Sequence, residues 1–243
     1  MTVHSESFGS VRLVTLDRPS RRNALDHDTL VALRQAQIEA VDAGVRVLVL
    51  TGRPPAFCAG ADLGGVEDGE FGRALFAVLR GFVELPFPVL GAIDGPALGA
   101  GMQLALSCDL RVASAPSRFG IPAAKLGLSI DHWTVERLAR DTGWSIARDM
   151  LLAASTYDAE ALHRNGFVHR IGTLADAMGW AEQVASLAPL TIAAHKTMLQ
   201  RSAPPPELDP VVEAARERAW RSADLQEGRR AFLDKRPPRF TGA

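Results

Sequence analysis

The chain has 243 residues, of which 47% are hydrophobic and 23% are charged. These proportions are ordinary for a globular protein and exclude a disordered chain, a collagen-like repeat and a disulfide-rich miniprotein. The 27 Lys and Arg residues nearly balance the 28 Asp and Glu residues, and no basic face stands out, so no nucleic-acid partner is expected.

The N-terminal residues lack the basic start and apolar middle of a signal peptide, and no apolar stretch is long enough to cross a bilayer. We therefore expect a cytoplasmic protein. The two cysteines, Cys58 and Cys108, are far apart in sequence, and no Cys or His spacing suits zinc. We expect two buried reduced thiols and no metal site.

The first predicted elements alternate between strand and helix. Residues 11–16 are apolar and β-branched, which predicts a strand. A helix is expected to begin after an N-cap at Asp26 and to end at Gly44, because its apolar residues recur with a helical period. The apolar run 45–51 predicts a buried strand. Strand, helix and strand in succession favour a parallel crossover and an α/β fold class.

The alternation continues through the middle of the chain. An apolar stripe predicts a helix over 71–82, and the glycine-rich segment 94–101 leads into a further helix that ends near Ser107. Strands are expected over 88–93, 110–113 and 118–121. From Asp131 onward the chain is predicted to be mostly helical, apart from a strand-like turn over 166–172.

No strand is expected beyond about Leu187. Three helical segments are predicted there, over 190–200, 211–221 and 223–236. They are amphipathic, and such a tail buries its apolar stripe against its own body or against a second copy of the chain. Oligomerisation is the natural expectation.

Two loops of small residues each present a backbone N–H that a ligand can approach closely. One belongs to Ala59 in the loop 52–63, and the other belongs to Ala100 at a predicted helix start. If the fold brings these amides together, they can hold one carbonyl oxygen and stabilise negative charge on it. The helix dipole at Ala100 adds a partial positive charge.

Four ordered segments and the end of the chain resemble signatures of the enoyl-CoA hydratase, or crotonase, superfamily. The four segments are LDRPSRRNAL (16–25), FCAGADL (57–63), GPALGAG (95–101) and CDLRVAS (108–114), and the tail is KRPPRFTG (235–242). Their order and spacing are similar to those of the family along nearly the whole chain. The pattern is most similar to mycobacterial and other actinobacterial members.

The resemblance implies a spiral of ββα turns over residues 1–187, followed by a helical trimerisation region over 188–243. It implies a homotrimer or a dimer of trimers that binds a fatty acyl-CoA thioester as ligand and needs no further cofactor. Ala59 and Ala100 would supply the oxyanion-hole amides. The CoA would be flanked by Arg22, Ala24, Leu25, Ala59, Gly60, Ala61, Asp62 and Leu63. Arg22 is equally well explained as a solvated surface charge.

The chain departs from the family at both acid–base positions. Family hydratases carry one glutamate after the second glycine loop and another in a Phe-Gly-x-Pro-Glu segment, whereas this chain has Gln103 and Ala123 there. A glutamine amide can hold a water but cannot accept its proton near neutral pH, and a methyl group can do neither. Gln103 is equally well explained as a buried amide that caps the neighbouring loop.

Asp131 is the one candidate carboxylate that remains. It falls where dienoyl-CoA isomerase-like members of the family place a catalytic aspartate, with His132 beside it as a weaker candidate. It also suits the N-cap of a helix that starts at His132, and this structural role is the stronger of the two.

Two functions follow from these positions. The first is an acyl-CoA binding or carrier protein of fatty-acid metabolism, without hydratase activity and with a protein partner in a lipid pathway. The second is an enoyl-CoA isomerase or hydratase of β-oxidation that uses Asp131 as acid and base. Thioester hydrolysis lacks a nucleophile, because Cys58 is most simply a packed thiol.

Overall fold

The computed structural model describes residues 2–62, 64, 69–202, 210, 214, 217, 220–239 and 241. The chain folds into two compact units, each made of two separate stretches of sequence. The first unit comprises Met1–Phe119 and Tyr157–Pro204, and the second comprises Gly120–Thr156 and Pro205–Ala243.

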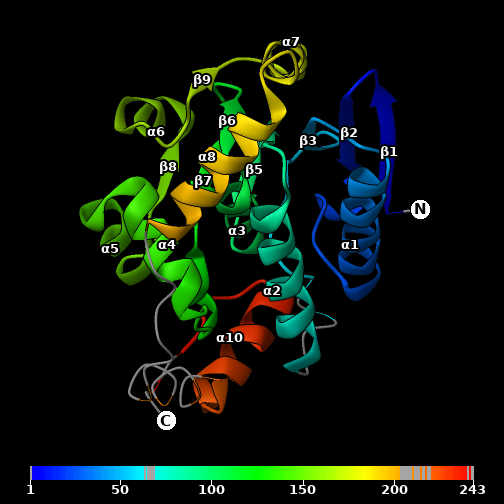
Figure 1. Ribbon diagram of the computed structural model, residues 1–243. Coiled ribbons are helices and arrows are strands. Elements are labelled where there is room, and N and C mark those ends of the chain that lie inside the picture. Colours follow the sequence, from blue (N-terminus) through cyan, green and yellow to red (C-terminus); the bar gives the residue numbers. More distant parts are fainter. Residues whose placement is uncertain are drawn as a thin grey trace. The chain divides into compact units, whose positions relative to one another are not determined.

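A six-stranded sheet organises the first unit, in the order β1-β2-β3-β4-β6-β9. Strands β1 and β2 form an antiparallel hairpin, visible in dark blue in Figure 1, and the remaining neighbours pair in parallel. The strands span Val3–Phe8 (β1), Val11–Leu16 (β2), Val47–Gly52 (β3), Val89–Ile93 (β4), Leu110–Ala113 (β6) and Arg170–Ile171 (β9). The predicted alternation of strands and helices, and with it the α/β class, is confirmed.

The centre of this sheet is covered on both faces. Every residue of β3 and β4 is buried, as their near-continuous apolar sequences predict for parallel strands between helical layers. Helix α7 (Leu174–Ala185) lies against the sheet through small residues, Ala177, Ala181 and Ala185. Because these side chains are short, the helix approaches the strand residues closely.

Helices α1 (His27–Asp42), α2 (Gly69–Glu84) and α3 (Ala100–Ser107) pack in succession, α1 on α2 and α2 on α3. The predicted N-cap of α1 is confirmed, since Asp26 Oδ1 accepts from the N–H of Thr29 at 2.9 Å. Such a cap satisfies one of the free amides at the helix start.

Helix α8 (Pro189–Arg201) is fixed to the first unit by the buried side chain of Lys196. Its ammonium group donates to the carbonyls of Phe82 and Phe87, at 3.2 and 2.9 Å, and to Asp109 Oδ2 at 2.7 Å. The Asp109 carboxylate also accepts from the N–H of Val89 at 2.8 Å. One cation therefore joins α8 to the end of α2 and to the starts of two strands.

Strand β9 follows α6 (Ala159–Asn165) and brings His169 beside Arg111. His169 Nδ1 accepts from the N–H of Arg111 at 3.2 Å, so the imidazole is held without a proton on that nitrogen. Burial, aided by the positive charges of Arg111 and His163, lowers the pKa of His169 to about 4.

This shift predicts a loss of stability in mild acid. The unfolded chain protonates His169 near pH 6.5 and the folded chain only near pH 4, so the free energy of unfolding is expected to fall as the pH decreases through this window. His169→Asn keeps a side-chain acceptor but does not titrate there. Urea unfolding at pH 7.5 and pH 5 should show a smaller difference for this variant than for the natural chain. An equal difference in both proteins would contradict the prediction.

The second unit joins distant parts of the sequence through tight glycine contacts. Its helices are the 3-10 helix η2 (Pro122–Leu126), α4 (His132–Thr142), α5 (Trp144–Leu152) and α10 (Ala223–Leu233). A Cβ atom added at Gly228 of α10 would lie 2.4 Å from the carbonyl oxygen of Leu126. A side chain there is excluded, and α10 packs directly on η2.

The predicted helix over 211–221 falls mostly outside the described residues. The oligomerisation role expected for 188–243 stays a prediction; within that range α8 belongs to the first unit and α10 to the second. A second sheet of three short strands has the order β5-β7-β8, with bounds Pro96–Leu98, Arg118–Gly120 and Thr156–Asp158. In the part of the chain that the structure describes, no helix is both long and apolar enough to span a bilayer.

Candidate functional site

The segment 57–62, one of the two predicted small-residue loops, runs beside β5. The N–H of Cys58 donates to the carbonyl of Pro96, and the N–H of Leu98 donates to the carbonyl of Cys58, both at 3.0 Å. These two bonds make a parallel bridge between Cys58 and Ala97. The loop is thereby held against the segment that leads into α3.

On its other side the same loop pairs with the turn that follows η1 (Pro19–Arg21). The N–H of Leu25 donates to the carbonyl of Gly60 at 2.8 Å, and the N–H of Asp62 donates to the carbonyl of Leu25 at 2.7 Å. The structure thus places the two segments that were predicted to flank CoA side by side. Leu63 lies outside the described residues.

A buried asparagine holds the first of these segments in place. Asn23 has a positive φ of 55°, and its Nδ2 donates to the carbonyls of Arg53 and Ala56 at 2.8 and 2.6 Å. Its Oδ1 accepts from the N–H of Arg18 at 2.9 Å. Asparagine tolerates the left-handed conformation better than most residues, and its amide supplies a donor and an acceptor at once.

The amide of Ala59 is hydrogen-bonded within the protein. In a trans peptide the C=O and N–H point in opposite directions, and the carbonyl of Cys58 is bonded to Leu98. The N–H of Ala59 therefore points away from Leu98, and it donates to the carbonyl of Arg22 at 3.0 Å. The expectation that Ala59 supplies an oxyanion-hole donor is corrected here, because this amide already has an acceptor.

The amide of Ala61 has the direction that was expected of Ala59. The carbonyl of Gly60 is bonded to Leu25, so the N–H of Ala61 in the same peptide points to the opposite side. That side is the start of α3, since a Cβ added at Gly60 would lie 3.1 Å from the carbonyl oxygen of Leu98 and 3.9 Å from the nitrogen of Ala100. Among the described residues, the backbone hydrogen bonds include none from the N–H of Ala61.

The amide of Ala100, the other expected donor, lies at the start of α3. Ala100 is the first residue of α3, and its N–H has no acceptor four residues earlier within the helix. The partial positive charge of the helix N-terminus lies at this amide. Gly101 allows the approach, because a Cβ there would lie only 2.1 Å from the carbonyl oxygen of Cys58. Within the described part of the chain, the amides of Ala61 and Ala100 therefore have no backbone acceptor and lie on adjacent segments of the first unit.

Comparison with known proteins decides the family. Residues 6–243 match the protein-family profile described as enoyl-CoA hydratase/isomerase. The chain belongs to the enoyl-CoA hydratase/isomerase family. The resemblance inferred from the motifs is confirmed over nearly the whole chain.

Individual relatives of this family agree. The chain is 43% identical over 235 residues to the probable enoyl-CoA hydratase echA6 of Mycobacterium tuberculosis (strain CDC 1551 / Oshkosh), covering 96% of this chain and 97% of the relative. It is 34% identical over 249 residues to the 2,3-dehydroadipyl-CoA hydratase of Escherichia coli (strain K12), covering 96% and 95%. Among solved structures, an enoyl-CoA hydratase/isomerase from Pseudoalteromonas atlantica T6c matches with a TM-score of 0.86 and 28% identity, covering 99% and 100%. The crotonase-type fold is confirmed.

The positions where the chain was expected to depart from the enoyl-CoA hydratase/isomerase family lie on two elements in different units. Gln103 is buried in the first turn of α3, and its N–H donates to the carbonyl of Gly99 at 3.1 Å. Ala123 lies in η2, where its carbonyl accepts from the N–H of Leu128 at 3.0 Å. Neither side chain can donate or accept a proton in the manner of a carboxylate.

Asp131 has the structural role that was expected as the alternative to catalysis. It is the N-cap of α4, where Oδ1 accepts from the N–H of Thr134 at 2.9 Å and Oδ2 accepts from the Thr134 hydroxyl at 2.7 Å. His132 beside it lies 3.6 Å from the carboxylate of Glu136. Because both carboxylate oxygens serve the cap, the catalytic role of Asp131 stays a prediction with a structural competitor.

Cys58 is expected to be unreactive in the folded protein. Complete burial raises the pKa of its thiol to about 12, so the nucleophilic thiolate is scarce at neutral pH. Iodoacetamide at pH 7.5 should leave Cys58 and the buried Cys108 unmodified in the native protein and alkylate both after unfolding in urea. Mass spectrometry distinguishes the two results. Rapid labelling of Cys58 in the native protein would show that its thiol is reactive and would contradict the prediction.

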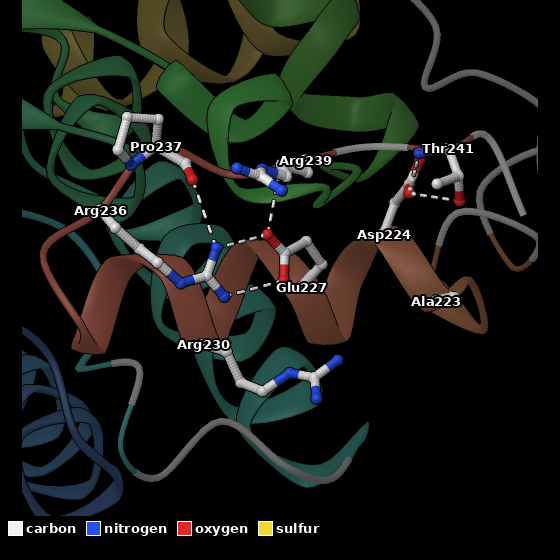
Figure 2. Close-up of a pocket in the computed structure, with 8 residues that line it drawn as sticks. All are labelled: Ala223, Asp224, Glu227, Arg230, Arg236, Pro237, Arg239 and Thr241. Atoms are coloured by element: carbon white, nitrogen blue, oxygen red, sulfur yellow. Dashed lines mark hydrogen bonds and ion pairs between the residues drawn. The ribbon is translucent and has the colours of Figure 1, made fainter.

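The second unit contains a pocket of about 650 Å³ between α10 and the tail that follows it. Figure 2 shows Glu227 at its wall, where Arg236 donates to both carboxylate oxygens, at 2.7 and 3.0 Å, and the N–H of Arg239 donates at 2.8 Å. The hydrogen bonds from Arg236 and Arg239 lower the pKa of Glu227 to about 2. With Arg230 also at the wall, the lining suits a polar or anionic group and not an acyl chain.

Proposed function

We propose that this protein binds fatty acyl-CoA thioesters and holds the thioester carbonyl oxygen with the N–H groups of Ala61 and Ala100. The observation that carries the proposal is the pair of unused amides on adjacent segments, one of them at a helix N-terminus. Two such donors stabilise partial negative charge on a carbonyl oxygen. The acyl-CoA ligand rests on membership of the enoyl-CoA hydratase/isomerase family and on relatives such as the E. coli enzyme, whose name specifies a CoA thioester.

We further propose that the protein does not hydrate enoyl-CoA at enzymatic rates. Gln103 and Ala123 stand where the motifs lead us to expect carboxylates, and each missing acid or base removes about 10²–10⁴ in rate. The protein then carries or senses acyl-CoA for fatty-acid metabolism. The alternative, isomerase or hydratase chemistry through Asp131, has the names of the relatives in its favour and the N-cap hydrogen bonds of Asp131 against it.

Calorimetric titration with acyl-CoA thioesters of increasing chain length, beside a hydration assay with crotonyl-CoA and longer enoyl-CoA substrates, tests the proposal. Binding without turnover is expected. Hydration at ordinary enzymatic rates would reject the carrier function. If turnover is found and Asp131→Asn abolishes it while acyl-CoA affinity is retained, the second function is correct.

The proposal includes assembly into a homotrimer or a dimer of trimers. Helix α8 leaves Leu190, Met198 and Leu199 exposed by 85%, 62% and 71%, and apolar side chains of this size on one short helix suit burial against another chain. Light scattering after size-exclusion chromatography measures the molar mass. A monomer at micromolar concentration would refute the assembly without affecting the thioester site.

A further inference from the structure

Arg18 joins the two segments that define the Ala61 side of the site. Its guanidinium donates to the carbonyl of Ala24 and lies 2.9 Å from Asp26 Oδ2 and 3.2 Å from Asp62 Oδ2. The Arg18 side chain is 18% exposed and those of Asp26 and Asp62 are 31% and 24% exposed, so these contacts are partly shielded from water. A guanidinium presents its donors in a rigid planar fork that spans acceptors several ångströms apart, whereas the donors of a lysine diverge from a single nitrogen atom.

The partners of Arg18 bracket one backbone pairing. Ala24 and Asp26 flank Leu25, and Asp62 follows Ala61, while Leu25 and Ala61 form an isolated parallel bridge. The two hydrogen bonds of this bridge fix the peptide between Gly60 and Ala61, and with it the direction of the Ala61 N–H. The side chain of Arg18 therefore contacts residues next to both partners of the bridge.

That peptide needs external support because it adjoins a glycine. Gly60 has a φ of +117°, a conformation that glycine adopts easily and also leaves easily. The backbone preferences of Gly60 alone therefore do not fix the orientation of the Ala61 amide. An isolated bridge with two hydrogen bonds is also weaker than a position within a long strand ladder.

The carboxylate of Asp26 gives Arg18 a charged partner in a fixed position. Burial opposes its ionisation, but the hydrogen bonds from Thr29 and the charge of Arg18 outweigh that effect and keep the pKa of Asp26 below its ordinary value. The carboxylate is thus charged at neutral pH and is fixed at the N-cap of α1. Arg18 connects the rigid start of α1 to the loop that carries Ala61.

We propose that Arg18 is a positioning residue for the thioester site: its bonds to Ala24, Asp26 and Asp62 hold the Ala61 N–H toward the carbonyl oxygen of the ligand. The inference rests on the proposed function. Arg18 does not touch the ligand in this scheme. It acts through the register between Leu25 and Ala61.

The test compares a saturated acyl-CoA thioester with the matching S-alkyl-CoA thioether, which has the same chain and nucleotide but no carbonyl oxygen. Calorimetry gives both dissociation constants, and their ratio reports the carbonyl contact alone. In Arg18→Gln the ratio is expected to fall about tenfold, the worth of roughly one directed hydrogen bond, with thioether affinity nearly unchanged. Arg18→Lys, which keeps the charge but loses the fork, is expected to behave like Arg18→Gln.

Arg21→Gln is the matched control, since Arg21 is an exposed arginine of the same turn, and it should retain the ratio of the natural chain. The infrared stretch of a ¹³C-labelled thioester carbonyl gives a second readout. It should be shifted to lower frequency when bound to the natural chain and less shifted when bound to Arg18→Gln. If Arg18→Gln does not fold, Asp62→Asn removes the charge of one partner only and should lower the ratio by a smaller factor.

The outcomes separate the two proposals. If the natural chain binds thioester and thioether equally well, the proposed hydrogen bonds from Ala61 and Ala100 to the carbonyl oxygen are refuted. A natural chain that prefers the thioester, with the same preference in the folded Arg18 or Asp62 variant, would overturn the role of Arg18 alone. Equal losses of thioester and thioether affinity would also overturn it, because Arg18 would then support the loop or the nucleotide generally.

Discussion

Gly101→Ala is expected to destabilise the protein by about 1–3 kcal/mol and to weaken acyl-CoA thioester binding at least about tenfold. The new Cβ would lie 2.1 Å from the carbonyl oxygen of Cys58 and 2.9 Å from Cys58 Cβ. Both atoms belong to a fully buried residue whose carbonyl is bonded to Leu98, so the loop cannot yield easily. The first turn of α3 must move instead, and the N–H of Ala100 moves with it.

Gly72→Ala provides the matched control. Gly72 is also a helical glycine, but it is exposed on α2, and no atom of the described residues lies within 4 Å of an added Cβ. Alanine has a higher helix propensity than glycine by about 1 kcal/mol, so this variant should be slightly more stable and bind normally. Thermal unfolding and calorimetry measure both effects. A Gly101→Ala variant that behaves like Gly72→Ala would show that the close contact is not needed.

Lys196→Ala is expected to lower the free energy of unfolding by about 3 kcal/mol, the lower end of the range for breaking a buried ion pair. The side chains of Lys196 and Asp109 are 8% and 19% exposed, so the carboxylate left behind is only partly solvated. The carbonyls of Phe82 and Phe87 also lose their donor. Removal of one cation thus affects three acceptors in a poorly hydrated place.

The exposed pair of Arg80 and Glu84 gives the comparison for this second change. These side chains lie 2.7 Å apart but are 36% and 61% exposed. Arg80→Gln should therefore change stability by less than about 1 kcal/mol. Urea unfolding of both variants measures the contrast. Equal small effects would mean that the Lys196 contacts are offset by the cost of desolvating the charges.

Sequence reasoning predicted the elements with strong patterns and missed those without. The strands over 11–16 and 110–113 and the N-cap at Asp26 are correct, because β-branched runs and capping side chains act locally. Strand β1 was missed because its second half, Glu6 to Phe8, is polar or exposed and is paired on one side only. The order of the strands depends on which distant residues pair, and no local pattern contains that information.

Sequence patterns also could not decide which backbone amide of the candidate site is free. The sequence predicts both loops and a helix start near Ala100, and the amides at a helix start have no acceptor within the helix. Ala59 and Ala61 are both small residues beside Gly60, so the sequence alone does not distinguish their amides. The direction of each amide follows from the hydrogen bond that the preceding carbonyl accepts, from the N–H of Leu98 for Cys58 and from the N–H of Leu25 for Gly60. The contacts of Asn23 with Arg53 and Ala56, and of Arg18 with Asp62, were missed for the same reason, since these partners are distant in sequence.

The division of the second unit between two stretches of sequence bears on how the chain is made in the cell. Residues of η2 leave the ribosome long before α10, against which Gly127 and Leu126 are packed without a gap. During synthesis that face of the earlier stretch stays uncovered until α10 has emerged. A chain that a nonsense codon ends before α10 is therefore expected to expose this face to chaperones and proteases, even when the first unit is already folded.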